Sequence, residues 1–520
     1  MTDTDTNTGT GTGTGTGTPG ILLVLDGWGH AAPGPGNALT NAHTPVLDAI
    51  AAKHPSTVVE ASGEHVGLLP GTVGNSEIGH MVIGAGRPLD YDSVLVQRQI
   101  DNGELGDNPR LTAALDRLAS NGGALHLVGQ VSDGMIHSHV DHLRALLTIA
   151  ASRGVQRVWV HAITDGRDVA DRTAGHYLAR VESFFTASGV GALATVSGRG
   201  YGLDKSGDLE LTAKVSEAIT DGKGATARDY GQVLAGAENG DVWVTPTVLT
   251  DADGEPLATV RDGDTVLFTN FRSDRIQQLA DDLVQILTDT DVDVLSLTQY
   301  DTKADIPALV GRADASGGLA DALESHGLRS VRIAEQEKFE HVTYYVNGRD
   351  DRVREVEEHV RITADTAPDY VARPEMNLAR VTEAITAAAR RDDVTLVIAN
   401  LANIDVVGHT GNHDATVKAA EHTDREVEKI LTAAAETGRW VLLVGDHGNA
   451  ERMSKPGPDG APLPYGGHTT NPVPAVVVPA PGQLTGENLA EGGSLADIAP
   501  TVLHLLGRPN GPAMTGRSLL

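Results

Sequence analysis

Cysteine is absent from the 520-residue chain, and aromatic residues make up only 3% of it. Without cysteine the protein can form no disulfide, thiolate nucleophile, cysteine-ligated zinc site or iron–sulfur cluster. Positive charge is also scarce, because 40 Lys and Arg residues face 70 Asp and Glu residues and leave a formal net charge of −30. Nucleic acid and anionic membranes are therefore not expected as partners, and an anionic small molecule would need a local cluster of Arg, Lys or metal.

Long apolar runs are missing as well. No stretch approaches the ~20 apolar residues of a membrane span. The N-terminus is rich in Asp, Thr and Gly, whereas a signal peptide would be basic and then apolar. A cytoplasmic protein is therefore expected. Residues 1–19 contain a repeated Thr-Gly unit that offers no side chains for a core, so we expect a disordered tail.

The apolar segments predict an α/β protein. Short, largely apolar runs typical of buried strands lie at 21–25, 394–398 and 440–444, and each leads to a segment that contains a carboxylate. Ligands of open α/β sheets bind at the carboxyl ends of the strands. The first and last parts of the chain are therefore expected to share one sheet and to carry the site.

The chain is longer than one hydrophobic core usually supports, which favours two domains. The middle of the sequence has its own alternation of apolar strand-like runs and helix-like segments. This pattern predicts a domain over 93–311 that is inserted into a discontinuous domain formed by 20–92 and 312–520.

Asp and His residues gather after the predicted strands in a way that a solvated surface does not require. They are Asp26, Asp405, His409, Asp446, His447 and His468. Carboxylate and imidazole ligands without thiolate suit Mn²⁺, Zn²⁺ or Co²⁺. A single one of these residues would more often be a helix cap or a structural histidine, but three such strand ends together indicate a metal site.

Ser76 lies in the segment 74–80 (GNSEIGH), which is typical of a turn that enters a helix. Backbone N–H groups at a helix N-terminus can hold a phosphate, and metal coordination can activate a serine hydroxyl as a nucleophile. Serine at this position is also a common helix N-cap. The spacing alone leaves both roles open.

Several further segments accompany 74–80. They are 24–29 (VLDGWG), 132–139 (SDGMIHSH), 165–168 (DGRD), 270–275 (NFRSDR), 337–339 (EKF) with 341–343 (HVT), and the segments around Asp405, Asp446 and His468. This set, in this order from about residue 21 to the C-terminus, resembles the cofactor-independent phosphoglycerate mutases. The set is specific, although no single segment is.

The resemblance implies an alkaline-phosphatase-like metal domain with an inserted α/β transferase domain. One metal would be held by Asp405, His409 and His468, and the other by Asp26, Ser76, Asp446 and His447. Substrate contacts would come from His137, Arg167, Asp168, Arg199, Arg272, Arg275 and Lys338. Arginine forks suit the phosphate and the carboxylate of a phosphoglycerate. The expected cofactors are two Mn²⁺ ions, with Zn²⁺ or Co²⁺ as alternatives and no 2,3-bisphosphoglycerate, and a monomer is expected.

The implied reaction interconverts 3-phosphoglycerate and 2-phosphoglycerate. Ser76 takes the phosphoryl group, the glycerate reorients while it is trapped between the domains, and its other hydroxyl takes the phosphoryl group back. Asp168 would transfer protons on the glycerate, and Lys338 would stabilise charge on the transferring group. Exclusion of water would keep the enzyme from acting as a phosphatase.

Two segments depart from the family pattern. Residues 169–172 (VADR) replace two prolines and a lysine, and in 198–207 (GRGYGLDKSG) Lys205 replaces a second substrate arginine while a following Trp is missing. Lys205 stays a candidate substrate contact, but lysine lacks the planar fork of arginine. A transferase for another phosphate or phosphonate, in secondary metabolism, and a metal-dependent phosphatase are therefore alternatives. A non-enzymatic binding protein would be expected to lack metal ligands, and here the set is complete.

Overall fold

The computed structural model describes residues 17–204, 206–364, 369–456, 461–483 and 488–520. Most of the expected tail, 1–19, lies outside the described residues. The chain folds as two compact units: unit 1 extends to Leu89 and resumes from Asp314 to Leu520, and unit 2 is Asp90–Ala313. The sequence predicts boundaries at 92/93 and 311/312, and the observed divisions lie at 89/90 and 313/314.

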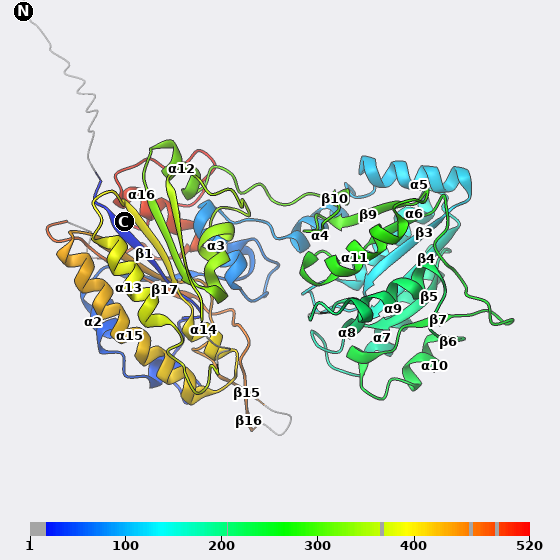
Figure 1. Cartoon of the computed structure of the whole chain (residues 1–520), viewed down its shortest axis with the longest axis horizontal. Coiled ribbons are helices and arrows are strands. Elements are labelled where there is room, and N and C mark those ends of the chain that lie inside the picture. Colours follow the sequence, from blue (N-terminus) through cyan, green and yellow to red (C-terminus); the bar gives the residue numbers. More distant parts are fainter. Residues whose placement is uncertain (1–16, 205, 365–368, 457–460, 484–487) are drawn as a thin grey trace, which may run out of the picture. The chain divides into compact units, whose positions relative to one another are not determined.

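Unit 1 is built on an eight-stranded sheet, seen at the left of Figure 1. In spatial order its strands are β12 (Glu357–Ile362), β11 (Ser330–Glu335), β13 (Leu396–Leu401), β1 (Gly20–Leu25), β14 (Trp440–Gly445), β17 (Val473–Val478), β2 (Ser56–Glu60) and β18 (Gly493–Ser494). β1 pairs in parallel with both β13 and β14, so Gly20 lies opposite Leu396 on one side and Trp440 on the other. The prediction that the first and last parts of the chain share a sheet is therefore confirmed.

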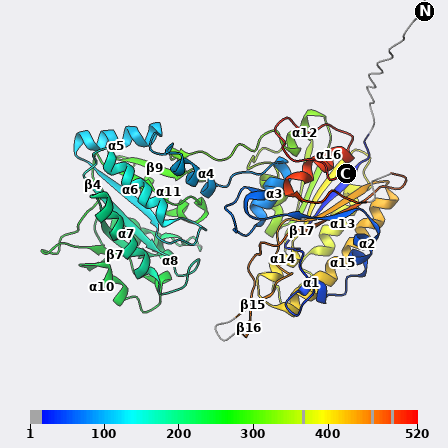
Figure 2. The same cartoon turned by 180° about the vertical axis from the view of Figure 1, so that it is seen from behind.

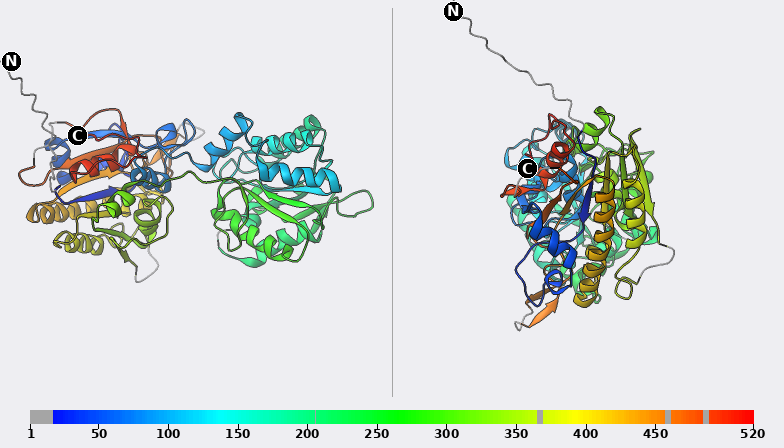
Figure 3. Two further views of the ribbon diagram at one scale, coloured as in Figure 1. Left: turned by 90° about the horizontal axis from the view of Figure 1, so that it is seen from above. Right: turned by 90° about the vertical axis from the view of Figure 1, so that its left-hand side faces the viewer.

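Helices cover both faces of this sheet. Those of unit 1 are α1 (Ala38–Asn41), α2 (Pro45–Lys53), α3 (Ser76–Ala85), α12 (Leu319–Ser325), α13 (Leu378–Ala389), α14 (Asn403–Gly408), α15 (His413–Glu436) and α16 (Ile498–Leu505). The C-terminal helix α16 lies on one face, and α13 and α15 lie together on the other, as the two views of Figure 3 show. A small hairpin joins β15 (Ser454–Pro456) to β16 (Pro462–Pro464).

Apolar side chains of β1, β13 and β14 pack under α13 and α15 in one continuous core. All six residues of each of these strands are buried, as expected for parallel strands covered on both faces. The predicted strand 394–398 begins later, at Leu396, and continues to Leu401, so Asn400 lies inside the strand rather than after it.

Unit 2 has a second eight-stranded sheet, seen from the opposite side in Figure 2. In spatial order its strands are β10 (Ala308–Val310), β9 (Asp293–Thr298), β8 (Thr265–Phe268), β3 (Ala124–Gln130), β4 (Arg157–Thr164), β5 (Ala192–Gly198), β7 (Thr247–Leu249) and β6 (Ala225–Ala227). Its helices are α4 (Asp92–Asp101), α5 (Pro109–Asn121), α6 (Val140–Ser152), α7 (Ala174–Ser188), α8 (Arg199–Gly202), α9 (Leu209–Thr220), α10 (Tyr230–Ala235) and α11 (Ser273–Leu287). The helix-like segments expected in the middle of the sequence correspond to helices such as α6 and α9.

Each face of the second sheet has its own core. Side chains of α5, α6 and α7 pack in one cluster, and those of α9 and α11 pack in another. The buried residues of α11 recur at intervals of three and four, as in Ile276, Leu279, Ala280 and Leu283, which is the spacing of a helix that covers a sheet with one face. The α/β prediction is confirmed for both units.

Among the described residues, no helix is both long enough and apolar enough to cross a lipid bilayer.

Candidate active site

Seven of the candidate residues in unit 1 gather at the carboxyl ends of its central strands. Asp26 follows β1, Asp446 and His447 follow β14, and Asp405 and His409 lie in and just after α14, which follows β13. His468 comes from the loop before β17, and Ser76 opens α3. We call these seven residues, together with Lys338 from the 3₁₀ turn Gln336–Lys338 after β11, the unit 1 cluster.

The cluster contains two groups of side chains whose polar atoms lie close enough to share an ion. Asp405, His409 and His468 form one group, and Asp26, Asp446 and His447 form the other; within each group the ligand atoms lie within 4.8 Å of one another. These are the two sets that the family resemblance implies, apart from Ser76.

The geometry of His409 and His468 fits a cation. Their Nδ1 atoms lie 2.8 Å from the backbone carbonyls of Gly466 and Gly74, respectively. A carbonyl only accepts, so each Nδ1 carries a hydrogen and the Nε2 of each neutral ring presents a lone pair. The two Nε2 atoms lie 3.1 Å apart. Two lone pairs this close repel each other, and a positive ion beside both nitrogens would offset the repulsion.

The geometry of the second group also fits a cation. Asp26, Asp446 and His447 are all fully buried, and Asp446 Oδ2 has no hydrogen-bond partner among the described residues. Burial alone would lower the pKa of His447, but Asp446 and Asp26 raise it to about 9. A buried carboxylate oxygen without a hydrogen-bond partner is costly, so the unpartnered Asp446 Oδ2 is consistent with a divalent ion in this group.

Ser76 lies beside the second group and Lys338. Its Oγ lies 2.9 Å from His447 Nε2, 3.3 Å from Asp26 Oδ1 and 2.6 Å from Lys338 Nζ. The alternative role as a helix N-cap is wrong, because Asn75 holds that position and accepts a hydrogen bond from the backbone of Ile78. The Ser76 hydroxyl is therefore directed at the cluster.

Lys338 supplies the fixed positive charge of the cluster. Its Nζ lies 2.8 Å from both Asp26 Oδ1 and Asp405 Oδ2. Burial would lower the pKa of Lys338, but Asp26, Asp405 and Asp446 overcome this and raise it above its ordinary value. The same ammonium lowers the pKa of Asp26 and of Asp405 against the effect of burial.

The remaining candidates lie in unit 2, again at the carboxyl ends of neighbouring strands. His137 follows β3, Arg167 and Asp168 follow β4, Arg199 follows β5, and Arg272 and Arg275 follow β8. These strands are adjacent in the order β8-β3-β4-β5. We call these six residues the unit 2 cluster. Lys205 lies outside the described residues.

Arg199 and Asp168 form the centre of the unit 2 cluster. Arg199 Nη1 lies 2.6 Å from Asp168 Oδ2 and 2.6 Å from Asp165 Oδ1. Burial raises the pKa of Asp168, although Arg199 opposes the shift. A raised pKa makes the protonated form of this carboxyl group easier to populate than that of an exposed aspartate.

His137 is buried among arginines. Burial lowers its pKa to about 2, and the charges of Arg272, Arg199 and Arg275 add to the shift. Its ring is therefore neutral, and it can donate or accept one hydrogen bond without adding charge. Several arginines around a neutral donor form the local basic patch that an acidic chain needs to bind an anion.

Sequence reasoning missed residues that hold these groups in place. Asp165 accepts hydrogen bonds from the backbone N–H groups of Arg167 and Asp168 and from Ser132, so it shapes the loop after β4. Asn449 donates to Asp405 Oδ1 at 3.0 Å, and Glu451 accepts from the backbone N–H of Asn449. Asp165 and Asn449 stand inside the motif segments, which was the only signal that could have singled them out.

The departures from the family pattern are accommodated locally. A Cβ on Gly200 would lie 2.6 Å from the ring of Trp243, so only glycine leaves room for this ring. The ring also packs edge-on against Tyr201, with centroids 5.7 Å apart. In the other segment, Asp171 accepts a hydrogen bond from the backbone of Asp241 at 2.7 Å.

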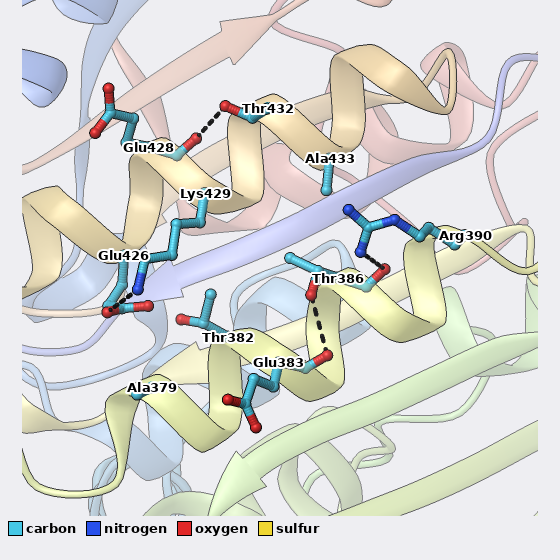
Figure 4. Close-up of a pocket in the computed structure, with 10 residues that line it drawn as sticks. All are labelled: Ala379, Thr382, Glu383, Thr386, Arg390, Glu426, Glu428, Lys429, Thr432 and Ala433. Atoms are coloured by element: carbon cyan, nitrogen blue, oxygen red, sulfur yellow. Dashed lines mark hydrogen bonds and ion pairs between the residues drawn. The ribbon is translucent and has the colours of Figure 1, made fainter.

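A groove of about 380 Å³ lies between α13 and α15, and none of its lining residues belongs to the two clusters (Figure 4). Its ten lining residues belong to α13 and α15 and include Arg390, which directly follows α13. Its charges are partly satisfied locally, since Lys429 pairs with Glu426 at 2.7 Å. The groove does not involve the strand ends.

Comparisons with known proteins agree with the geometry. The model of the metalloenzyme superfamily matches residues 18–510. The chain is 62% identical over 504 residues to a 2,3-bisphosphoglycerate-independent phosphoglycerate mutase of Streptomyces coelicolor, covering 96% of this chain and 98% of the relative. It is 39% identical over 517 residues to the enzyme of the same name from Desulforudis audaxviator, covering 96% of this chain and 99% of that one.

A solved structure supports the same relationship. The chain resembles phosphoglycerate mutase of Leishmania mexicana, determined at low cobalt concentration, with a TM-score of 0.76 and 27% sequence identity. The similarity covers 97% of each chain. Both units are therefore shared with these relatives.

Proposed function

The chain belongs to the 2,3-bisphosphoglycerate-independent phosphoglycerate mutases, within the metalloenzyme superfamily, and on that premise we propose how its residues perform the reaction. It is an isomerase that interconverts 3-phosphoglycerate and 2-phosphoglycerate and depends on divalent metal. The observation that carries the mechanism is the position of Ser76 Oγ, within 3.3 Å of Asp26, His447 and Lys338.

One ion would be held by Asp405, His409 and His468, and the other by Asp26, Ser76, Asp446 and His447. Mn²⁺ is the proposed metal in both sites, because mixed carboxylate and imidazole ligands suit it. When bound, the metals lower the pKa of the Ser76 hydroxyl and offset charge on the phosphoryl oxygens.

The Ser76 oxygen, once deprotonated, forms a bond to phosphorus as the bond from phosphorus to the glycerate oxygen breaks. Asp168 gives its proton to the departing oxygen. After the glycerate reorients, Asp168 takes a proton from the other hydroxyl, whose oxygen then displaces Ser76 from phosphorus. The raised pKa of Asp168 supports this exchange.

Lys338 and the unit 2 cluster would supply the charge that an anionic substrate requires. The Lys338 ammonium stabilises the transferring phosphoryl group. Arg167, Arg199, Arg272 and Arg275 bind the substrate's anionic oxygens, and the neutral ring of His137 hydrogen-bonds to the substrate. Lys205 is proposed as a further contact in the segment that departs from the family.

The remaining features follow from the proposed reaction. Glycolytic mutases act where their substrate is made, so we place this enzyme in the cytoplasm. We propose a monomer in which unit 1 is the metal domain and unit 2 the transferase domain.

Turnover of 3-phosphoglycerate by the Mn²⁺-loaded enzyme, without added 2,3-bisphosphoglycerate, tests the proposal. Phosphorus NMR should show 2-phosphoglycerate accumulating to an equilibrium mixture. Release of free phosphate instead would indicate a phosphatase. No reaction in a protein with both ions bound would indicate a transferase for another phosphate or phosphonate.

A further inference from the structure

Two buried polar residues behind the nucleophile have no part in the mechanism above. His80 in α3 and Asn400 in β13 are both fully buried. His80 ends the GNSEIGH segment, one helical turn after Ser76, and Asn400 lies 320 positions away in the sequence. Their side chains nevertheless lie in hydrogen-bond contact, with Asn400 Nδ2 3.1 Å from His80 Nε2.

The hydrogen bonds fix the orientation of both side chains. His80 Nδ1 lies 2.8 Å from the backbone carbonyl of Ser76, which can only accept, so Nδ1 carries the hydrogen and Nε2 accepts. The Asn400 amide donates to that Nε2 and also donates to Asp26 Oδ2 at 2.6 Å. A flipped amide would turn its oxygen toward a carboxylate and a lone pair, so only one orientation is favourable.

The pair also faces the second carboxylate of the same metal group. His80 Nδ1 lies 3.4 Å from Asp446 Oδ2, the carboxylate oxygen that lacks a hydrogen-bond partner among the described residues. The other oxygen, Asp446 Oδ1, accepts from the backbone N–H groups of Gly27 and His447. One His–Asn pair therefore contacts both aspartates of the group: Asn400 contacts Asp26 and His80 contacts Asp446.

This arrangement determines which oxygen Asp26 presents. Oδ2 is occupied by Asn400, so Oδ1 is left facing Ser76 Oγ at 3.3 Å and Lys338 Nζ at 2.8 Å. Partners of this kind orient metal-binding carboxylates and tune their affinity. We propose that His80 and Asn400 are positioning residues that hold Asp26 and Asp446 in the orientation that binds the ion next to Ser76.

The proposal rests on the assignment of Asp26, Asp446 and His447 as a metal group, and Mn²⁺ titration of metal-free protein by calorimetry tests both. Wild type should take two ions. Asn400→Ala should bind one of them 10- to 100-fold more weakly while the other keeps its affinity. In a His468→Ala background, which impairs the other group, the weakened ion should be the one that remains.

A matched control separates positioning from general stability. Asn347 is also buried and donates its amide to a buried carboxylate, Glu357, at 3.0 Å, so Asn347→Ala should lower the melting temperature without weakening either ion. If Asn400→Ala does not fold, His80→Asn serves instead, because its amide N–H can replace Nδ1 as the donor to the Ser76 carbonyl, whereas the shorter side chain has no acceptor at the position of Nε2.

Three outcomes decide the matter. Selective weakening of one ion in Asn400→Ala or His80→Asn supports the positioning role. Wild-type affinity for both ions in these variants overturns it. A wild type that takes fewer than two ions overturns the site assignment itself, and the inference with it.

Discussion

The ammonium nitrogen of Lys338 lies 2.6 Å from the hydroxyl oxygen of Ser76, close enough to hydrogen-bond to it. The same nitrogen contacts one carboxylate from each of the two metal groups, Asp26 and Asp405, at 2.8 Å. Lys338 thus ties the nucleophile to both groups and places a fixed positive charge where phosphoryl oxygens would arrive. Its removal should affect the chemical step more than substrate binding.

Lys338→Met should therefore lower kcat by roughly 10²- to 10³-fold, the usual cost of losing one charge-stabilising donor, with a much smaller change in KM. Steady-state kinetics on 3-phosphoglycerate measure both constants. Lys429→Met, which removes an exposed lysine on α15, should leave both unchanged. A raised KM with an unaltered kcat would assign Lys338 to substrate binding alone.

Asp168→Asn tests the proton exchange proposed for the glycerate. The amide keeps the size of the side chain but cannot release or take up a proton, so kcat should fall by about 10²- to 10⁴-fold. Melting temperature should change little. A variant with near wild-type kcat would show that another group carries the protons.

Arg199→Lys tests the arginine fork in unit 2. The substitution keeps a positive charge that could replace Arg199 Nη1 beside Asp165 and Asp168, but it loses the planar fork that binds an anion through two nitrogens. KM for 3-phosphoglycerate should rise at least tenfold. Arg172→Lys, at an exposed position nearby, is the control. Equal KM values for the two variants would argue against substrate binding by Arg199.

Glu335, at the end of β11, should make stability depend on pH. Burial raises its pKa from 4.5 to about 7. The stability that the protonated group contributes is therefore fully present below pH 4.5 and is lost as pH rises through 7. Glu335→Gln cannot titrate, so its free energy of unfolding should rise by about 1–3 kcal/mol relative to that of wild type between pH 5 and pH 8.

Urea unfolding at the two pH values measures this difference. Glu340→Gln, on an exposed residue of the following segment, should show the same pH dependence as wild type. A constant difference between Glu335→Gln and wild type would mean that Glu335 titrates alike in the folded and unfolded states.

Removal of the metals should destabilise unit 1, because ions that bind only the folded state add free energy of unfolding. The gain is about 2.7 kcal/mol at a concentration 100 times Kd for one site. Differential scanning fluorimetry with a chelator should show a lower melting temperature that Mn²⁺ restores. An unchanged melting temperature would contradict metal binding by the buried carboxylates.

The parts of the site that the sequence could predict are those that follow single strands. Asp26, Asp446 and His447 stand directly after apolar runs, and parallel strands bring such positions to one edge. The sequence could place Ser76 at a helix start. It could not show that the Ser76 hydroxyl faces the site, because only the structure shows that Asn75, one residue earlier, is the N-cap.

The supporting contacts could not be predicted, for a physical reason. The hydrogen bonds of Asn400 with Asp26 and His80 join β13 to β1 and α3 across more than 300 positions. They depend on the register that pairs Val24 with Asn400. No spacing within the sequence reports that register. Asn400 is the one polar residue of β13 and lies near the end of this otherwise apolar strand.

The central claim is that Ser76 carries the phosphoryl group, and rapid quenching of the turning-over enzyme tests it most directly. Mass spectrometry of the peptide that contains Ser76 should show one phosphate on this residue within the first turnover, and Ser76→Ala should show neither phosphopeptide nor 2-phosphoglycerate. Mutase turnover by Ser76→Ala, or phosphate trapped on a different residue, would contradict the account.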